Sequence, residues 1–343
     1  MERLRVGIVG VGGIATSRHI PAFLAIPDMV DVVAVFDQQL ERAVIVAEEL
    51  GIPFVAKKYE ELLDAVDAVV ICTPNRFHSE LAVTALSAGC HVLCEKPMAT
   101  SVEECKRMLE AANQANKKLM IAYHYRFMKE AQAAKRLIDA GEVGMPLVIR
   151  VQALRRRKVP GWGVFTNHSL QGGGCLMDYG CHLLDLALWL TGHEEIESIT
   201  GRTYEEISRN PNEINEWGSY DTEKIDVEDH ATAYITFKNG ASLLFETSWA
   251  ANIEADKETL SISGTSGGLD VFPLALNQSK HGMLQTMKPD YIEGADDPSV
   301  PQATNFVKSA LGLEPLLVEP EQAMEVNRII EAIYSQSGKR ENQ

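Results

Sequence analysis

The sequence contains no long apolar run, and its aromatic residues make up only 7% of the chain. A membrane-spanning helix needs about 20 apolar residues. The longest apolar run, near Leu183 to Leu190, is interrupted by Asp185, so we expect no membrane span. Positive charge is also scarce: 32 basic against 48 acidic residues give a net charge of −16. That charge disfavours general binding to nucleic acids or to anionic lipid surfaces.

Cysteine is similarly sparse, with six residues in 343. Cys90 and Cys94 are separated by three residues in an expected strand, and no second Cys/His pair completes a tetrahedral site, so we expect no metal. Met1 leads directly into a strand-like run, Val6 to Val9, without an apolar export segment. We therefore expect a cytoplasmic protein whose cysteines remain thiols.

A chain of 343 residues with 45% hydrophobic residues is long enough for two domains. Up to about residue 122, short β-branched runs alternate with helical patterns, which predicts a parallel sheet with right-handed crossovers. After residue 125, longer alternating segments and the turn dipeptide Asn239-Gly240 predict an open, largely antiparallel sheet. The boundary expected is therefore between residues 1–124 and 125–343. The strands expected in the first part are 4–9, 30–36, 53–55, 67–71, 90–94 and 118–122.

The first turn after a strand contains the pattern G-x-G-x-x-A from Gly10 to Ala15, including Gly12, Gly13 and Ile14. Such glycines let the backbone turn tightly and approach a pyrophosphate at a helix N-terminus. The pattern alone is weak, but a strand precedes it and a helix is expected after it.

Asp37 ends the next expected strand, where a carboxylate would hold the adenosine ribose hydroxyls. A carboxylate also repels a 2′-phosphate, and Gln38 and Gln39 bring no positive charge, so NAD(H) is favoured over NADP(H). The alternative is that Asp37 is an ordinary solvated loop residue.

Two more loops follow expected strands, and open α/β sheets bind ligands beyond the carboxyl ends of their strands. One contains Thr73, Pro74, Asn75 and His78, and the other begins Glu95-Lys96-Pro97. An ammonium at Lys96 would stabilise negative charge developing on an oxygen. Read alone, Lys96 is as readily a surface lysine.

A third region runs from Gly172-Gly173-Gly174 to Asp185. On a helix, Asp178 and His182 are four residues apart and share a face. A histidine titrates near neutral pH, and a carboxylate beside it can orient the ring while it accepts a proton. Alternatively, Asp178 caps the helix and His182 is a hydrogen-bonded core residue.

Taken together and in this order, these motifs resemble the Gfo/Idh/MocA family of nicotinamide-dependent sugar and cyclitol oxidoreductases. The resemblance implies an N-terminal Rossmann domain, residues 1–124, and a C-terminal α+β domain, residues 125–343, whose open sheet mediates assembly into a homodimer or homotetramer. It implies that Lys96, Asp178 and His182 are catalytic, with His182 as general acid–base. It also implies that NAD(H) is bound by a set of residues in the first domain: Gly10, Gly12, Gly13, Ile14, Asp37, Thr73, Pro74, Asn75, His78, Glu95 and Lys96.

Substrate residues are harder to select. The run Arg155 to Lys158 is either a solvated charged face or, with Trp162, part of a pocket in which Arg157 would meet an anionic group. Further candidates are Tyr125 and Arg126 after the last strand of the first domain, and His168 before the glycine run.

The function expected is NAD-dependent oxidation of a secondary hydroxyl of a sugar, glycoside or cyclitol such as inositol. Two alternatives remain at this stage. One is a glycosidase of the same fold that oxidises the sugar transiently, and the other is a non-catalytic sensor of nucleotide or sugar.

Overall fold

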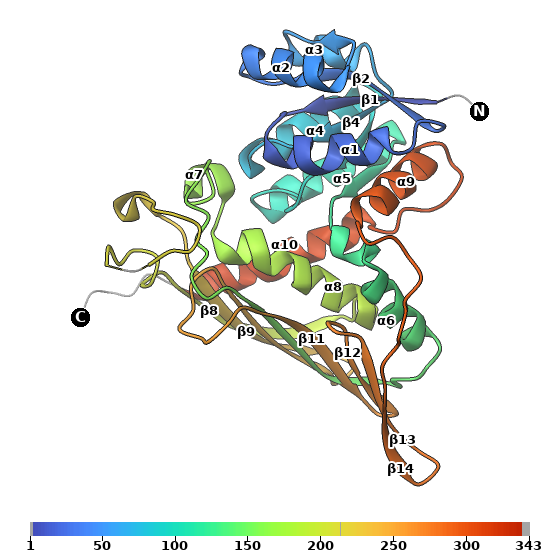
Figure 1. Ribbon diagram of the computed structural model, residues 1–343, viewed down its shortest axis with the longest axis vertical. Coiled ribbons are helices and arrows are strands. Elements are labelled where there is room, and N and C mark those ends of the chain that lie inside the picture. Colours follow the sequence, from blue (N-terminus) through green and yellow to red (C-terminus); the bar gives the residue numbers. More distant parts are fainter. Residues whose placement is uncertain (1–2, 213, 338–343) are drawn as a thin grey trace. The chain divides into compact units, whose positions relative to one another are not determined.

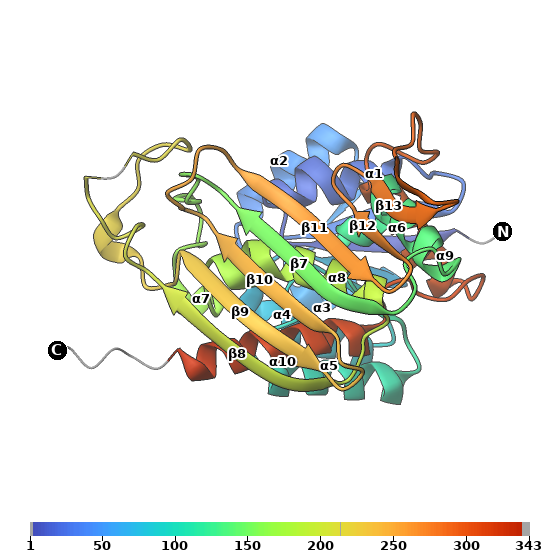
Figure 2. The same cartoon turned by 90° about the horizontal axis from the view of Figure 1, so that it is seen from below.

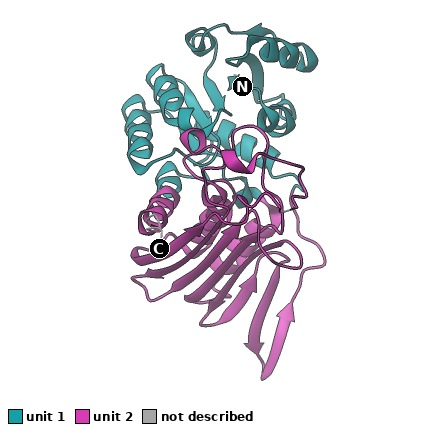
Figure 3. Ribbon diagram, turned by 90° about the vertical axis from the view of Figure 1, so that its left-hand side faces the viewer, with its two compact units in different colours: residues 1–127, 295–324 teal, residues 128–294, 325–343 magenta. Residues whose placement is uncertain are grey.

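The computed structural model describes residues 3–212 and 214–337. The chain divides into two compact units, Met1–Phe127 with Ala295–Met324 and Met128–Gly294 with Glu325–Gln343 (Figure 3). Residues 295–324 thus group with the first unit, whereas the predicted second domain included them. The division into an NAD-binding domain, residues 1–124, and a substrate-binding domain, residues 125–343, stays a prediction.

The first unit is built on a six-stranded parallel sheet in the order β3-β2-β1-β4-β5-β6 (Figure 1). This is the order of a doubly wound dinucleotide-binding fold, in which the strand order reverses between β1 and β4. Its strands are short, and the inner ones are mostly buried, because helices cover both faces of such a sheet. They are β1 (Leu4–Val9), β2 (Val30–Phe36), β3 (Phe54–Val55), β4 (Ala68–Ile71), β5 (His91–Cys94) and β6 (Leu119–Ile121).

Helices alternate with these strands along the chain. The helix after β1 begins with a π-helical segment, η1 (Ala15–His19), and continues as α1 (Ile20–Leu24). In α5 (Val102–Ala115) the Ser101 hydroxyl accepts the Glu104 N–H and so caps the start of the helix. The remaining helices of the unit are α2 (Leu40–Leu50), α3 (Tyr59–Leu63), η2 (Asn75–Phe77), α4 (His78–Ser87), α5 (Val102–Ala115), η3 (His124–Phe127) and α9 (Ser299–Ala310).

The second unit contains an eight-stranded sheet in the order β14-β13-β12-β11-β7-β10-β9-β8. Neighbouring strands are antiparallel except β7 and β10, which are parallel. The predicted hairpin at Asn239-Gly240 is present, with φ +89° at Gly240. The strands are β7 (Pro146–Leu154), β8 (Ile196–Tyr204), β9 (His230–Phe237), β10 (Ser242–Ser248), β11 (Lys257–Gly264), β12 (Gly267–Asp270), β13 (Ala275–Lys280) and β14 (Met283–Met287).

Helix α8 (Cys181–Thr191) packs on β7 on one face of this sheet, and the opposite face is turned toward the viewer in Figure 2 with no helix in front of it. The unit also contains α6 (Lys129–Asp139), α7 (His168–Gln171), η4 (Leu176–Gly180) and η5 (Thr222–Lys224). Helix α10 (Pro320–Gln336) continues from the first unit into the second. Among the described residues, no helix combines the length and apolar composition that a membrane span requires.

Candidate active site

The glycine loop follows β1 at the carboxyl edge of the parallel sheet, next to the end of β4. Gly10 has φ +84°, and a Cβ there would lie 2.9 Å from the Cys72 carbonyl oxygen, so only glycine fits. At Gly12 and Gly13, by contrast, a Cβ would meet no atom of the described residues within 4 Å. The backbone leading to Ile14 is therefore open to close approach, as a bound pyrophosphate requires.

Asp37 lies against this loop. Its Oδ2 accepts the Val11 N–H at 3.0 Å, and its Oδ1 accepts the Gln39 N–H at 2.8 Å. The Arg42 guanidinium is 3.7 Å from the same carboxylate. The residues at the end of β2 thus fit a dinucleotide whose ribose hydroxyls meet Asp37. Arg42 brings a positive charge near this position. This charge was not predicted from the sequence, where only the uncharged Gln38 and Gln39 were considered.

Thr73, Pro74 and Asn75 connect β4 to η2, and His78 begins α4. The Thr73 hydroxyl oxygen is buried without a hydrogen-bond partner among the described residues. The His78 ring is fully buried, with Nδ1 2.9 Å from the Pro97 carbonyl oxygen and Nε2 3.0 Å from that of Thr73. Burial lowers the pKa of His78, against the opposing effect of these carbonyls. The ring therefore ties the loop after β4 to the loop after β5.

Glu95 and Lys96 follow β5, and Glu95 is buried. The His19 Nε2 is 2.6 Å from Glu95 Oε1, and Oε2 accepts the Lys96 backbone N–H at 3.1 Å. Burial alone would raise the pKa of Glu95, but the His19 hydrogen bond and the nearby Lys96 lower it to about 2. This carboxylate thus connects the helix behind the glycine loop with the backbone of Lys96.

Tyr125 and Arg126 lie in η3, after β6. The His124 and Tyr125 rings are in edge contact, 4.9 Å between centroids. Arg126 is fully buried, and its guanidinium donates to the Leu317 carbonyl and the Gln322 side chain. In this structure Arg126 holds the returning segment of the first unit.

In the second unit, Asp178 lies in the π-helical segment η4, and His182 lies in the first turn of α8, which continues it. The Trp249 indole N–H donates to Asp178 Oδ2 at 3.1 Å, and the Arg155 guanidinium is 3.9 Å from the same oxygen. His182 is buried and Asp178 partly exposed. A π-helical turn within an α-helix is frequent at functional sites. The two predicted acid–base residues thus lie on one continuous helix, and the Asp178 carboxylate accepts one hydrogen bond from Trp249 and forms an ion pair with Arg155.

The glycine run before this helix has a packing cause. A Cβ at Gly173 would lie 2.0 Å from the Tyr334 hydroxyl, and one at Gly174 would lie 1.9 Å from the Glu228 carbonyl oxygen. The buried Glu228 carboxylate accepts the N–H groups of Gly174 and Leu176 at 2.8 and 2.9 Å and the Tyr334 hydroxyl at 2.9 Å. Burial raises the pKa of Glu228 to about 7, against the effect of these donors. Glu228 therefore fixes the start of the helix that carries Asp178 and His182.

Arg155 is the residue of the basic run that lies beside Asp178. Its guanidinium is 4.2 Å from the Tyr179 ring centroid and 4.6 Å from that of Trp217. Arg157 instead donates to the Ala251 carbonyl and the Asn252 side chain.

The other two substrate candidates of the second unit are exposed. Trp162 lies 5.2 Å from Trp217 between ring centroids, with 52% of its surface exposed. His168 opens α7, and its backbone N–H donates to Asp226.

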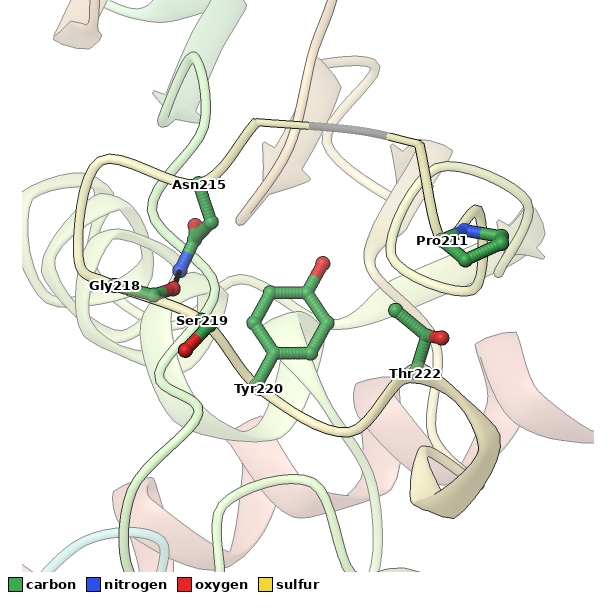
Figure 4. A pocket seen from close by; sticks show the side chains of 6 residues that line it. All are labelled: Pro211, Asn215, Gly218, Ser219, Tyr220 and Thr222. Atoms are coloured by element: carbon green, nitrogen blue, oxygen red, sulfur yellow. Dashed lines mark hydrogen bonds between the residues drawn. The ribbon is translucent and has the colours of Figure 1, made fainter.

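A cavity of about 270 Å³ lies within the long loop before β9 (Figure 4). It is lined by Pro211, Asn215, Gly218, Ser219, Tyr220 and Thr222, and the Tyr220 ring points into it. None of the predicted site residues is among these. Elsewhere in the described chain, no group of three or more His, Cys, Asp or Glu side chains could hold a metal ion.

Sequence reasoning missed several side chains that shape these clusters: His19, Arg155, Tyr179, Trp217, Glu228 and Trp249. Arg155, Glu228 and Trp249 reach Asp178 or the start of its helix from distant segments of the second unit, so no local spacing marks them. Trp217 contacts Arg155, and Tyr179 is the neighbour of Asp178 in the sequence. Trp249 had one local signal, since a tryptophan ending a buried strand needs a partner for its indole N–H.

Comparison with known proteins agrees with these features. Residues 4–123 match a family described as an oxidoreductase family with an NAD-binding Rossmann fold, and residues 131–270 match the Gfo/Idh/MocA C-terminal domain. The chain is 35% identical over 334 residues to the D-glucoside 3-dehydrogenase of Escherichia coli strain K12, covering 96% of this chain and 94% of that protein. It is 28% identical over 296 residues to a levoglucosan dehydrogenase of Pseudarthrobacter phenanthrenivorans, covering 78% and 73%.

Among solved structures, levoglucosan dehydrogenase in complex with NADH and levoglucosan superimposes with a TM-score of 0.84 at 25% identity, covering 98% of both chains. The two family matches lie in the predicted order and together span most of the sequence. The chain therefore belongs to the Gfo/Idh/MocA family of oxidoreductases, and its N-terminal part is an NAD-binding Rossmann domain.

Proposed function

We propose that the chain is an NAD-dependent dehydrogenase that oxidises a secondary hydroxyl of a glycoside or related sugar. The arrangement around Asp178 carries the proposal, because this carboxylate is held by Trp249 and Arg155 on the helix that also bears His182. The extended similarity to a D-glucoside 3-dehydrogenase supports a glycoside rather than a cyclitol.

The residue roles follow from acid–base chemistry. Bound NAD⁺ supplies the acceptor for the two electrons that leave with the carbinol hydrogen. His182 accepts the hydroxyl proton and passes it to solvent, so that alcohol and NAD⁺ become ketone, NADH and a proton. Asp178 orients His182, and the ammonium of Lys96 stabilises the oxygen as it gains negative charge. Glu95 and His78 act as positioning residues, because their contacts fix the loop that carries Lys96.

The test is an absorbance assay for NADH with methyl glucosides, levoglucosan, glucose 6-phosphate and myo-inositol as substrates. We expect stoichiometric NADH and a keto product with glucosides. If NAD binds and an aglycone is released without net NADH, the chain is a glycosidase of the same fold. If ligands bind and nothing turns over, the chain is a sensor.

Replacing Gly12 with valine separates cofactor binding from folding. The φ of Gly12 lies outside the left-handed region, and a Cβ there meets no described atom, so we expect an unchanged melting temperature. The side chain would occupy the space into which the pyrophosphate comes, so affinity for NADH should fall by about tenfold or more. Fluorescence titration with NADH and thermal melting measure the two effects. Unchanged affinity would remove the assignment of Gly12 to the cofactor.

Replacing Asp37 with serine should shift cofactor preference. Loss of the carboxylate removes both the partner of the ribose hydroxyls and the repulsion of a 2′-phosphate, and leaves Arg42 at that position. We expect the ratio of kcat/KM for NADP⁺ to that for NAD⁺ to rise by about tenfold or more. Adding Arg42→Ala should reverse the gain. A ratio unaffected by Asp37→Ser would contradict the assigned role of Asp37.

We also propose that the open face of the eight-stranded sheet pairs with a second copy of the chain in a homodimer or homotetramer. Tyr234 and Leu244 are directly opposite each other on β9 and β10 and are 47% and 45% exposed. Their neighbours Ala233, Ile235 and Leu243 alternate to the buried face. Apolar surface of this kind is typical of interaction sites.

Glutamate at both Tyr234 and Leu244 should therefore yield a monomer in light scattering. The control is Phe54→Glu, an exposed apolar residue of the first unit, which should leave the mass unchanged. A wild-type protein that is already monomeric would refute the pairing.

A further inference from the structure

An exposed pair of aromatic side chains, here called the aromatic shelf, lies near Asp178 and its partner Arg155. The proposed reaction does not use it. It consists of Trp162 and Trp217, which are 52% and 40% exposed. The two indoles lie 5.2 Å apart between centroids at an angle of 52°, and Phe165 contacts Trp162 in edge geometry at 6.2 Å. Contiguous exposed apolar surface often marks an interaction site or a ligand-binding groove.

Contacts between two loops hold the shelf in place. The Asn215 side chain accepts the Val159 N–H at 2.8 Å and donates to the Val159 carbonyl at 3.0 Å. The Glu216 N–H donates to the Arg157 carbonyl at 2.8 Å. A Cβ at Gly161 would lie 2.4 Å from Tyr220 Cβ, so these loops are in close contact. Since both indoles come from fixed loops, little further ordering is needed when a ligand binds.

The shelf is connected to Asp178 through one side chain. The Arg155 guanidinium stacks on Trp217, 4.6 Å from the ring centroid, and lies 3.9 Å from Asp178 Oδ2. Its other face meets Tyr179, whose hydroxyl donates to Glu258 at 2.7 Å. The Arg155 side chain thus contacts both the shelf and Asp178. A substituent bound on the shelf would therefore be attached to the sugar ring that reacts near Asp178.

The basic side chains near the shelf are already engaged within the second unit. Lys158 pairs with Asp256 and Glu216. Arg156 donates to the Glu254 carbonyl, and Arg157 to Ala251 and Asn252. The basic run is therefore engaged by acceptors of the same unit, so a sugar phosphate gains little there. Flat, exposed aromatic surface favours an apolar, planar group.

We infer that Trp162 and Trp217 bind the aglycone of the glycoside, so that glucosides with an aromatic aglycone are better substrates than methyl glucoside. The inference rests on the proposed function and specifies its substrate class. Stacking on two indoles should raise kcat/KM for phenyl glucoside over methyl glucoside by about tenfold, largely through KM.

The experiment compares kcat and KM for phenyl glucosides, methyl glucosides of the same anomeric configuration, and glucose. It uses the wild-type chain, Trp217→Ala, Trp162→Ala and the double variant. The control is Tyr291→Ala, which removes an aromatic residue that is 78% exposed elsewhere in the same unit. Thermal melting verifies that each variant is folded, and Trp217→Phe preserves a stacking surface if the alanine variant is unstable.

We expect the phenyl-to-methyl ratio of kcat/KM to fall toward unity in the double variant and to stay high in Tyr291→Ala. A wild-type ratio near unity overturns the inference. So does an equal loss for phenyl and methyl glucosides in Trp217→Ala, because the indoles would then hold the oxidised ring itself. If no glycoside reduces NAD⁺, the proposed function fails, whereas turnover of methyl glucoside without an aromatic preference removes only the shelf.

Discussion

Replacing His182 with alanine should lower kcat by about a hundredfold to ten-thousandfold while leaving the affinity for NADH nearly unchanged. The substitution removes the group that accepts the hydroxyl proton, and His182 belongs to the second unit, whereas the glycine loop and Asp37 belong to the first. The two measurements are kcat at saturating glucoside and fluorescence titration with NADH.

The matched control for His182 is His281→Asn, which removes an exposed histidine and keeps a residue that tolerates the φ of +56° found there. It should be as active as the wild type. A kcat of His182→Ala within a few-fold of the wild type would remove the general-base assignment. An equal loss of turnover and NADH affinity would show instead that the substitution disturbs the fold.

Replacing Gly174 with alanine should destabilise the second unit by about 3 kcal/mol or more. The new Cβ would lie 1.9 Å from the Glu228 carbonyl oxygen, which is a backbone atom and has no rotamer by which to move away. Relief requires separating the two segments, and that breaks the hydrogen bonds from Gly174 and Leu176 to the Glu228 carboxylate. Because these bonds fix the start of the helix bearing Asp178, activity should fall together with stability.

Gly268→Ala is the control for Gly174, because a Cβ at Gly268 would have its nearest neighbour at an ordinary 3.6 Å. Thermal melting should show a drop of roughly 6–12 °C for Gly174→Ala and little change for Gly268→Ala. A Gly174→Ala protein that melts with the wild type would mean that the close approach to Glu228 is not maintained in solution.

Much of the fold could be predicted because its strongest signals are local. The β-branched runs of the first unit coincide with β1 to β6 to within one residue. Buried parallel strands are marked in a sequence by short, nearly continuous apolar runs. The strands β13 and β14 were not predicted. All five residues of β14 are exposed, so it has no alternation of buried and exposed side chains to reveal it.

The sequence motifs predicted the residues of the candidate site, but they did not predict the side chains that contact those residues. Spacing alone selected Asp178 and His182 as a pair on one helix, but it also assumed a regular α-helix where the chain has a π-helical segment. The contacts of Asp178 come from Arg155 and Trp249, residues 23 and 71 positions away in the sequence. Such contacts depend on how β7 and β10 pair, which a single sequence does not encode in any short window.

Because residues 295–324 belong to the first unit, truncation and proteolysis should affect that unit differently. In that unit, Phe306 of α9 meets Phe23 of α1 edge to face, 6.4 Å between ring centroids, and buried Arg126 donates to the Leu317 carbonyl. A fragment ending at residue 127 would leave Phe23 without its aromatic partner and Arg126 without that acceptor. Conversely, a protease that cuts the chain between residues 127 and 128 would yield two fragments. These fragments would stay associated, because residues 295–324 of the second fragment pack on residues 1–127 in the first unit. Nicked protein should therefore migrate as one species under native conditions and as two under denaturing conditions.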